Sequence, residues 1–480
     1  MIRSLELENF KGVAGRQRIE LAPLTLLFGP NSAGKSTILQ ALLYLQEVLS
    51  TGSADIDRTE LGGQAVDLGG FSRLVHQHDL RRTMRLRVAF ATTGGLNPFH
   101  HVLNQDYLSD LDDELTDAWV EVAIAADSGT PKVQRLLVGS AGVDEPVLEL
   151  WPSGTEGVAI AELHTLHPLL DGRGVLERLG DRAFQAQADR LGILVAIRAG
   201  TVVPPLDESI AVQDDFGPTE ESVEARHLVE MLSVGVLRQL VRLLSRTLYL
   251  GPLRSVPPRS FLSERSRRQS GWADGMAAWD ALLGDSTGTL VSATNMWLTR
   301  LGARCEVRVQ DLFDPSADAA RASDVSAATV RRLVLNLEGA DVLPAEVGTG
   351  ISQVIPVVVA ALVGERKPIA LIEQPELHVH PALQVALGDL FIENCGPRRQ
   401  FIIETHSEHL ILRILRRIRE TTEKDLPDEA PEFDETKLSV LYAEAAPDGA
   451  RVRRLRVDNQ GEFVDKWPKG FFAERMQELL

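Results

Sequence analysis

Residues 29–37, Gly-Pro-Asn-Ser-Ala-Gly-Lys-Ser-Thr, have the types and spacing of a phosphate-binding loop. They fit the pattern G-x-x-x-x-G-K-[ST] in full. The glycines let the backbone turn its N–H groups toward a phosphate chain, Lys35 would reach the β- and γ-phosphates, and the Ser36 hydroxyl would bind Mg²⁺. The residues predicted to surround the phosphates are Gly29, Asn31, Gly34, Lys35, Ser36 and Thr37.

The segments around this loop have the pattern that the chemistry requires. The apolar run 24–28 predicts a buried strand leading in, and residues 38–43 predict a helix leading out. The amino end of that helix adds a partial positive charge near the phosphates. The alternative is a chance glycine turn, but the order strand, loop, helix favours the phosphate site.

Two later strands end in groups that suit the same site. Residues 369–376 form an apolar run that ends in carboxylates at Glu373 and Glu376. A phosphate loop needs a neighbouring parallel strand to bring an acid to Mg²⁺ and to the attacking water. Residues 400–407 form another apolar run, which ends near His406. That histidine could hold the γ-phosphate or the water, or it could simply open the next helix.

A second glycine-rich turn opens an apolar helix at residues 346–356. Gly348, Thr349, Gly350 and Ser352 could form another phosphate cradle at the amino end of this helix. One nucleotide needs one such cradle in its own chain, so we expect the second to cap the nucleotide of a partner subunit. The alternative is an ordinary helix start.

Composition sets limits on the class of protein. The 480 residues include 68 acidic and 50 basic side chains, with a net charge of −18, so contact with nucleic acid would need a local basic patch. The cysteines, Cys305 and Cys395, have no ligand spacing, which suits a reducing cytoplasm. The sequence has neither a signal-peptide pattern nor an apolar run of membrane-spanning length.

The distribution of these motifs predicts an α/β fold with an inserted lobe. Residues 1–95 would form the first part of an ATPase head, 96–245 an accessory lobe, and 246–480 the rest of the head. A long helical pattern runs over 219–244, and a hairpin turn is expected at 447–449. The sequence has no internal repeat and no sustained heptads, which argues against a long coiled-coil arm.

The order of these motifs resembles the ABC-type ATPase heads of the RecF, SMC and OLD group. The box at 373–381, Glu-Gln-Pro-Glu-Leu-His-Val-His-Pro, is similar to the EQPELHLHP box of a bacterial branch of AAA-labelled, OLD-like ATPases. Residues 249–254 and 467–472 also resemble that branch. The resemblance covers the head and implies ATP and Mg²⁺ as cofactors, with head-to-head pairing into a homodimer or a higher homo-oligomer.

By this resemblance Glu373 takes the acid position beside Mg²⁺, together with Ser36. Gln374 stands where many relatives carry the catalytic glutamate, so either Glu376 or His406 activates water, or hydrolysis is slow and ATP acts as a clamp. Gly348 occupies the usual serine position of the signature turn, and Ser352 is a candidate to replace it. After His406 no Asp-x-Asp pair follows a strand, which predicts that a Toprim nuclease domain is absent.

Two smaller features have rival interpretations. Four histidines could converge on zinc: His378, His380, His406 and His409. For His378 and His380, a place at the dimer interface is the better interpretation. A basic segment could bind a nucleic-acid backbone or an acidic partner, or could be merely solvated: Arg254, Arg259, Arg265, Arg267 and Arg268.

The sequence therefore predicts a Mg-ATP-dependent ABC-type ATPase. The expected role is an ATP-gated sensor or regulator in bacterial anti-phage defence or DNA maintenance, coupled to a separate effector protein. The alternative is a RecF-like DNA-binding repair ATPase, so a nucleic-acid partner is left open. A transporter subunit fits the extra lobe and the Glu-Gln-Pro-Glu box poorly.

Overall fold

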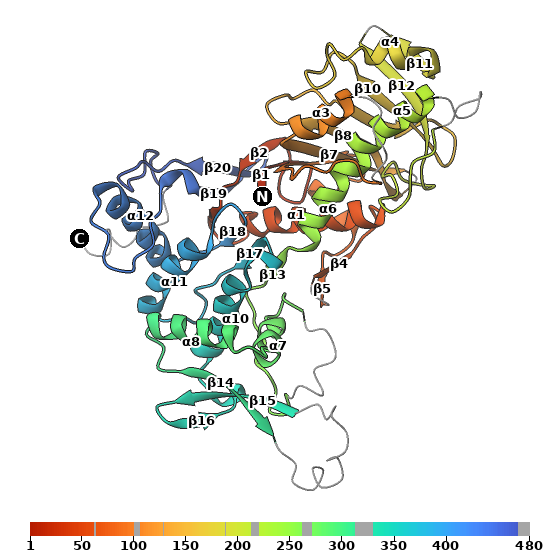
Figure 1. The fold of residues 1–480 in the computed structure, drawn as a ribbon. Coiled ribbons are helices and arrows are strands. Elements are labelled where there is room, and N and C mark those ends of the chain that lie inside the picture. Colours follow the sequence, from red (N-terminus) through yellow and green to blue (C-terminus); the bar gives the residue numbers. More distant parts are fainter. Residues whose placement is uncertain are drawn as a thin grey trace, which may run out of the picture.

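The computed structural model describes residues 1–61, 64–99, 106–127, 129–187, 189–212, 220–261, 271–312 and 330–468. Two large sheets organise these residues, and a smaller sheet forms the far end of the molecule from the nine-stranded sheet (Figure 1). The α/β class expected from the sequence is confirmed. In the described part of the chain, no helix has the length and apolar character needed to span a bilayer.

The six-stranded sheet carries the phosphate loop. Its order is β13 (Leu248–Leu250), β17 (Ile369–Glu373), β18 (Gln400–Glu404), β3 (Leu24–Phe28), β19 (Leu438–Ala446) and β20 (Gly449–Leu455). The first five strands are parallel, and β20 returns antiparallel from β19 through the expected hairpin turn. All residues of β3, β17 and β18 are buried, as expected for a parallel sheet covered on both faces.

Alternate residues of these strands enter different cores. In β17, Ile369 and Leu371 join the core that contains α1 (Lys35–Thr51), whereas Ala370 and Ile372 join the other core. The period of two along a strand produces this division. The second core is built on α10 (Thr349–Leu362), α11 (Pro381–Asn394) and α12 (Glu408–Glu423).

The nine-stranded sheet is antiparallel throughout and forms the lobe at the upper right of Figure 1. Its order is β11 (Gln185–Gln187), β12 (Arg190–Ala196), β10 (Val158–His164), β9 (Leu148–Pro152), β8 (Thr130–Ser140), β7 (Asp117–Asp127), β6 (Met84–Ala91), β1 (Ile2–Glu8) and β2 (Gln17–Glu20). The expected lobe boundary at residue 95 thus falls between β6 and β7, which are hydrogen-bonded neighbours.

One long helical segment packs on this sheet and on α1. It consists of α5 (Glu220–Glu230), a π-helical turn (Met231–Gly235) and α6 (Val236–Ser245). The helix expected over 219–244 is confirmed from residue 220 onward, and Thr219 lies outside the described residues. Gly235 is required in the π turn, because a Cβ there would lie 2.0 Å from the carbonyl oxygen of Leu96.

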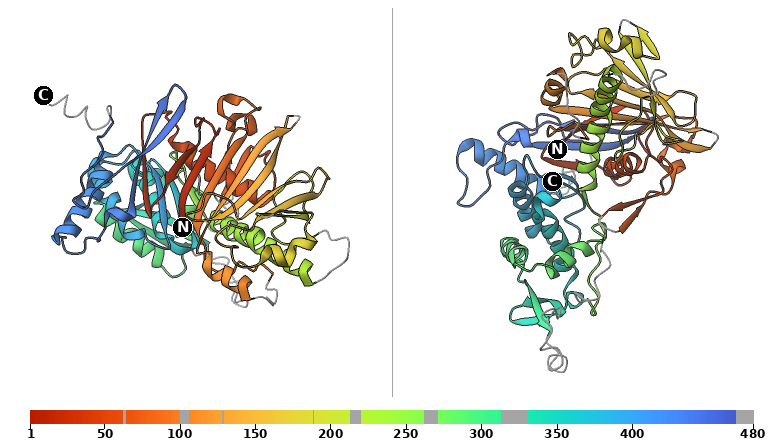
Figure 2. Two further views of the ribbon diagram at one scale, coloured as in Figure 1. Left: turned by 90° about the horizontal axis from the view of Figure 1, so that it is seen from above. Right: turned by 45° about the vertical axis from the view of Figure 1, so that its right-hand side comes forward.

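The remaining elements are smaller. The third sheet contains β14 (Glu306–Leu312), β15 (Val330–Leu337) and β16 (Ala340–Val342), and it packs near α7 (Met276–Leu283) and α8 (Thr289–Arg300) (Figure 2). The other elements are β4 (Arg58–Leu61), β5 (Gln64–Asp67), α2 (Phe71–Leu74), α3 (Asp106–Glu114) and α4 (Val175–Leu179). Short 3₁₀ turns lie at His76–His78, Gly180–Arg182, Pro344–Glu346, Gly364–Arg366 and Glu435–Lys437.

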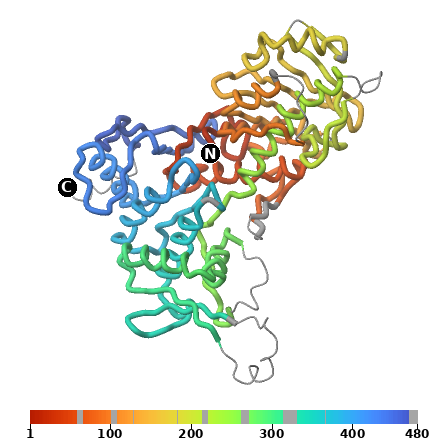
Figure 3. Tube along the Cα trace, viewed as in Figure 1, coloured from red at the N-terminus to blue at the C-terminus, as the bar shows by residue number. Residues whose placement is uncertain are grey.

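Segments from the two ends of the sequence meet in the head. The trace in Figure 3 brings the first strands beside β19 and β20. Gln17 donates from Nε2 to the carbonyl oxygen of Ala450, and Gln400 bonds through its amide to both backbone groups of Ile2. In the segment 467–472, which resembles the OLD-like branch, residues 469–472 lie outside the described residues. Arg265, Arg267 and Arg268 also lie outside them.

Candidate functional site

The loop of residues 29–37 joins β3 to α1 and needs glycine at two places. Gly29 has φ 143°, and a Cβ there would lie 2.2 Å from the carbonyl oxygen of Ala443 on β19. Gly34 caps α1 with φ 95°, in the left-handed region that favours glycine. Asn31 is exposed, whereas Thr37 is buried in the first turn of α1. The expected strand, loop and helix are therefore confirmed.

Lys35 is buried between its own loop and a carboxylate. Its Nζ donates to the carbonyl oxygens of Gly29 and Pro30 at 3.0 Å each, and lies 3.6 Å from Oε1 of Glu404. Burial lowers the pKa of Lys35, and the Glu404 carboxylate opposes that shift. The ammonium group is thus held at the loop by backbone dipoles and by one acid.

Glu404 is the acid closest to the loop, and sequence reasoning missed it. It ends β18, and its Oε2 accepts a hydrogen bond from the Ser36 hydroxyl at 2.7 Å. The expectation that the strand bearing Glu373 is the immediate neighbour of the loop strand is wrong, because β18 lies between β17 and β3. The order of parallel strands follows from crossover packing and not from their order in the sequence.

Glu373 ends β17 and stands beside Glu404 in the strand register. Its Oε1 accepts a hydrogen bond from the Tyr249 hydroxyl at 2.8 Å. Burial, reinforced by the nearby Glu404 carboxylate, raises the pKa of Glu373 to about 7. Two carboxylates therefore lie together at the carboxyl edge of the sheet beside Ser36, and one of them holds its proton up to neutral pH.

Glu376 bonds to the segment that follows β18. Its Oε2 accepts from the Thr405 hydroxyl at 2.9 Å, and its Oε1 accepts from the backbone N–H of His406 at 2.6 Å. Burial raises the pKa of Glu376, while these hydrogen bonds oppose the shift. The His406 imidazole is half-buried, and burial together with the charge of Lys35 lowers its pKa. Glu376 and His406 are thus brought together, with His406 near the loop lysine.

The signature turn lies at the amino end of α10. Gly348 and Thr349 are exposed, and Gly348 has open space around a built Cβ. A Cβ on Gly350 would lie 2.9 Å from the carbonyl oxygen of His378, so this turn packs closely on the loop after β17. Ser352 is 1% exposed, and its hydroxyl donates to the Thr349 carbonyl oxygen at 3.0 Å. The accessible part of the turn is therefore 348–350.

A buried arginine connects this helix with the acid strand. Nη2 of Arg254 donates to the carbonyl oxygens of Glu373 at 2.6 Å and Gln374 at 3.1 Å. The carbonyl oxygen of Arg254 accepts from Nε2 of Gln353, on α10, at 2.7 Å. Burial lowers the pKa of Arg254 to about 10. The segment 249–254 thus supplies both the Tyr249 and the Arg254 contacts of β17. Because Arg254 is 5% exposed, it is neither a solvated residue nor an available contact for nucleic acid, unlike the expectation for the basic segment.

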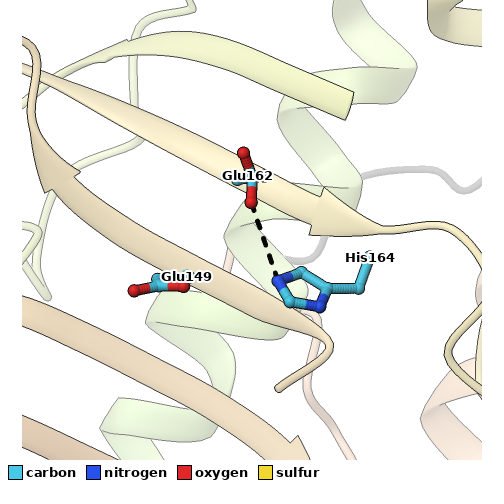
Figure 4. Close-up of side chains that lie close together, drawn as sticks. All are labelled: Glu149, Glu162 and His164. Carbon is cyan, nitrogen blue, oxygen red and sulfur yellow. Dashed lines mark ion pairs between the residues drawn. The ribbon is translucent and has the colours of Figure 1, made fainter. Parts of the chain in front are cut away.

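The zinc interpretation of the histidines gains no support. Nδ1 of His380 accepts the Ala382 N–H at 3.2 Å as the cap of α11. Across the described ranges, the group of possible ligands with atoms within 4.8 Å of one another is Glu149, Glu162 and His164, in the accessory region (Figure 4). Arginines already neutralise it: Arg135 pairs with Glu149 at 2.5 Å, and Arg190 contacts Glu162 at 2.8 Å and His164 at 2.7 Å. A metal ion would have to displace these guanidinium groups.

Two family models match separate parts of the chain. Residues 169–413 match the family described as "AAA domain, putative AbiEii toxin, Type IV TA system", and residues 1–91 match the family described as "AAA ATPase domain". The first match covers the signature turn, both acid strands and His406, and the second covers the phosphate loop. The chain belongs to the first of these AAA families. For this AAA protein, no curated protein gives a match.

Solved structures similar to the AAA protein include heads of SMC proteins. The SMC head bound to the C-winged helix domain of ScpA is 10% identical with a TM-score of 0.45, covering 95% of this chain and 98% of that chain. The SMC head domain from Thermotoga maritima is 11% identical with a TM-score of 0.38, and the match covers 95% of this chain and 99% of that chain. A third structure is an Smc head domain with an extended coiled coil, bound to the C-terminal domain of ScpA derived from Pyrococcus furiosus. It is 10% identical with a TM-score of 0.41, and the match covers 100% of this chain and 98% of that chain.

Proposed function

We propose that this AAA protein binds Mg-ATP at residues 29–37 and hydrolyses it as an ABC-type ATPase. The observation that carries the proposal is the meeting of Lys35 and Ser36 with the carboxylates that end β17 and β18. A lysine in a glycine loop suits a phosphate chain. Hydroxyl and carboxylate oxygens are the hard ligands that Mg²⁺ prefers, directly or through water.

The donor set fits magnesium. Ser36, Glu373 and Glu404 would hold the ion, and Mg²⁺ would supply neutralisation of charge on the phosphate oxygens. The loop N–H groups between Gly29 and Gly34 would bind phosphate, with Lys35 as the point charge, and Asn31 and Thr37 would complete the cradle. Binding a cation beside Glu373 would release the proton that burial retains on its carboxyl group.

The roles of the next residues follow from their bonds. Gln374 has an amide and cannot act as a general base. Both oxygens of Glu376 already accept hydrogen bonds from Thr405 and His406. This favours Glu376 as the residue that orients the His406 segment, and His406 as the group that positions the attacking water. Glu376 as the general base is the competing assignment, and turnover of the variants separates the two.

We also propose that two copies pair head to head, as a dimer or as part of a larger homo-oligomer. The turn with the exposed Gly348 and Thr349 and the half-buried Gly350 would then cap the nucleotide of the partner subunit. Ser352, inside the helix, would support the turn through its bond to Thr349. Arg254 joins this helix to β17. A movement of the turn onto the partner's nucleotide would therefore change the position of Glu373 in the same chain.

For the cellular role we propose an ATP-gated regulator in bacterial anti-phage defence or DNA maintenance, acting through a separate effector protein. The description of the family as a putative toxin of a type IV toxin–antitoxin system supports a defence role. The competing role is DNA repair of the RecF type. We expect Mg-ATP-dependent assembly and slow ATP hydrolysis in purified protein. DNA that strongly stimulates turnover would favour the repair role, and ATP-independent behaviour in both assays would refute the ATPase proposal.

A further inference from the structure

A cavity of about 400 Å³ lies at the edge of the six-stranded sheet opposite the phosphate loop. Pro368 and Gln400 mark the amino ends of β17 and β18, whereas the loop lies at the carboxyl ends of the same parallel strands. Met1 and Ala91 contribute a wall from the nine-stranded sheet, and Leu243 contributes one from α6. The cavity therefore touches both large sheets and is separate from the nucleotide site.

The charged residues that line this cavity are all basic: Arg242, Arg246, Arg398 and Arg399. This concentration contrasts with the net charge of −18 for the whole protein. Lys367 adds to it: burial lowers its pKa first, and the charges of Arg246 and Arg399 lower it further. The guanidinium charges of Arg246 and Arg399 therefore act on the Lys367 ammonium group in the same direction as burial.

Helix α6 does not account for this charge by itself. Arg242 and Arg246 are four residues apart at its carboxyl end, where like charges face each other but the helix dipole favours cations. Arg398 and Arg399 come from a separate tight turn, closed by the bonds between Gly396 and Arg399. Two elements that are distant in sequence therefore bring their arginines to the same cavity.

Arg399 is held rigidly at the recess. It is 6% exposed, and its Nη1 and Nη2 donate to the carbonyl oxygens of Gly364 and Ala360. Its Nε is buried without a hydrogen-bond partner. Within the described ranges, no carboxylate lies within ion-pair distance of Arg242, Arg399 or Lys367, although other acids of the protein pair widely. Backbone bonds hold Arg399 in place without neutralising its charge.

We propose that this cavity binds a small phosphorylated molecule. Guanidinium groups match phosphate oxygens in charge and shape, and the volume is that of a small-molecule site. Leu243, Pro368 and Pro397 offer apolar walls for the rest of the ligand. Nucleic acid would need a continuous basic groove along its backbone, whereas these cations surround one recess. The ligand would sit where Gln400 joins β18 to β1, in contact with both sheets.

The test uses inorganic pyrophosphate as the probe in calorimetry. The full chain carries Lys35→Ala, so that the phosphate loop does not compete for the probe. We expect one remaining site, and we expect Arg242→Ala combined with Arg398→Ala to weaken it at least about tenfold, because two charge-assisted contacts are lost. Both side chains are exposed, so the core stays intact. Arg454→Ala, an exposed arginine on β20 at the far edge of the sheet, is the matched control and should change nothing.

Three results would overturn the proposal. The Lys35→Ala protein could show no pyrophosphate binding, or the arginine pair could leave that binding unchanged. A single-stranded oligonucleotide of about 30 nucleotides could bind more tightly than pyrophosphate through the same arginines, which would assign the site to nucleic acid. Arg242→Lys with Arg398→Lys keeps the charge but not the planar guanidinium group, so this protein should bind pyrophosphate more tightly than the alanine pair and less tightly than the Lys35→Ala parent.

Discussion

The hydroxyl of Ser36, at the start of α1, donates a 2.7 Å hydrogen bond to Oε2 of Glu404, at the end of β18. This bond joins the loop expected to bind phosphate to the strand beside it. Because Glu373 stands next to Glu404 in register, the metal-side acid of the proposed site is a pair of carboxylates and not one residue.

Glu404 should therefore matter for magnesium. Glu404→Gln removes a negative charge beside Ser36 and keeps the size of the side chain. We expect the Mg²⁺-dependent part of ATP affinity to fall by about tenfold or more, the range seen when groups around a metal are changed. A Mg²⁺ titration at fixed ATP measures this. Glu423→Gln, exposed at the end of α12, is the control, and equal Mg²⁺ dependence in the two variants would remove Glu404 from the site.

Glu373 should make the stability of the metal-free protein depend on pH. Its folded pKa is about 7 and its ordinary value is 4.5, so the folded state binds the proton more tightly. The resulting stabilisation is complete below about pH 4.5 and is lost as the pH rises through 7. We expect a loss on the order of 3 kcal/mol in the free energy of unfolding over this window.

Glu373→Gln should flatten that part of the pH profile, because the amide has no proton to lose. Urea unfolding at several pH values, with a chelator present, measures the difference between the two proteins. Identical profiles would show that the Glu373 carboxyl does not retain its proton. Added Mg-ATP should bind more tightly as the pH rises through 7, since the ionised carboxylate is the form that binds cations.

The water-positioning roles can be separated by turnover. Under the proposal, His406→Ala should bind ATP but lose most hydrolysis. Glu376→Gln should reduce hydrolysis less, because an amide oxygen can still accept from His406 N–H. Gln374→Glu, which adds a carboxylate where relatives carry one, should speed hydrolysis. Single-turnover rates decide the matter. If Glu376→Gln abolishes turnover and His406→Ala does not, Glu376 is the base.

The signature turn should act across the dimer. Gly348 is a cleaner position for substitution than Gly350, because a Cβ at 348 meets nothing within 4 Å whereas one at 350 would clash with the His378 carbonyl. Gly348→Arg should leave ATP affinity within about twofold and abolish ATP-dependent assembly, since the side chain would fill the space of the partner's phosphates. Light scattering with and without Mg-ATP measures this, with Gly396→Arg, at the opposite edge of the sheet, as the control. Normal assembly of Gly348→Arg would refute the capping role.

The strands and helix around the loop could be predicted because their apolar runs are continuous and lead directly into glycine or acid. Glu404 was missed because the prediction for the run 400–407 concerned only His406. Its position, the last residue of a buried apolar strand like that of Glu373, was a usable signal. Strand order could not be predicted, because non-local packing places β18 beside β3.

The accessory region was predicted less completely. The sequence predicts an accessory lobe over 96–245 but not its strands β8, β10 and β12, each of which is a neighbour in the same antiparallel sheet. The strand Val158–His164 carries Glu162 and His164, which contact Arg190 of β12 only in the folded sheet. The sequence alone does not reveal such pairing across strands.

The most direct test is calorimetric titration of Mg-ATP into the parental protein and into Lys35→Ala, with Lys466→Ala, an exposed lysine, as the control. The account predicts that Lys35→Ala loses ATP affinity by at least about a hundredfold, because the one point charge on the phosphate chain is removed, and that its melting temperature stays close to the parental value. Equal ATP affinity in the parental and Lys35→Ala proteins would contradict the phosphate-loop assignment and the function built on it.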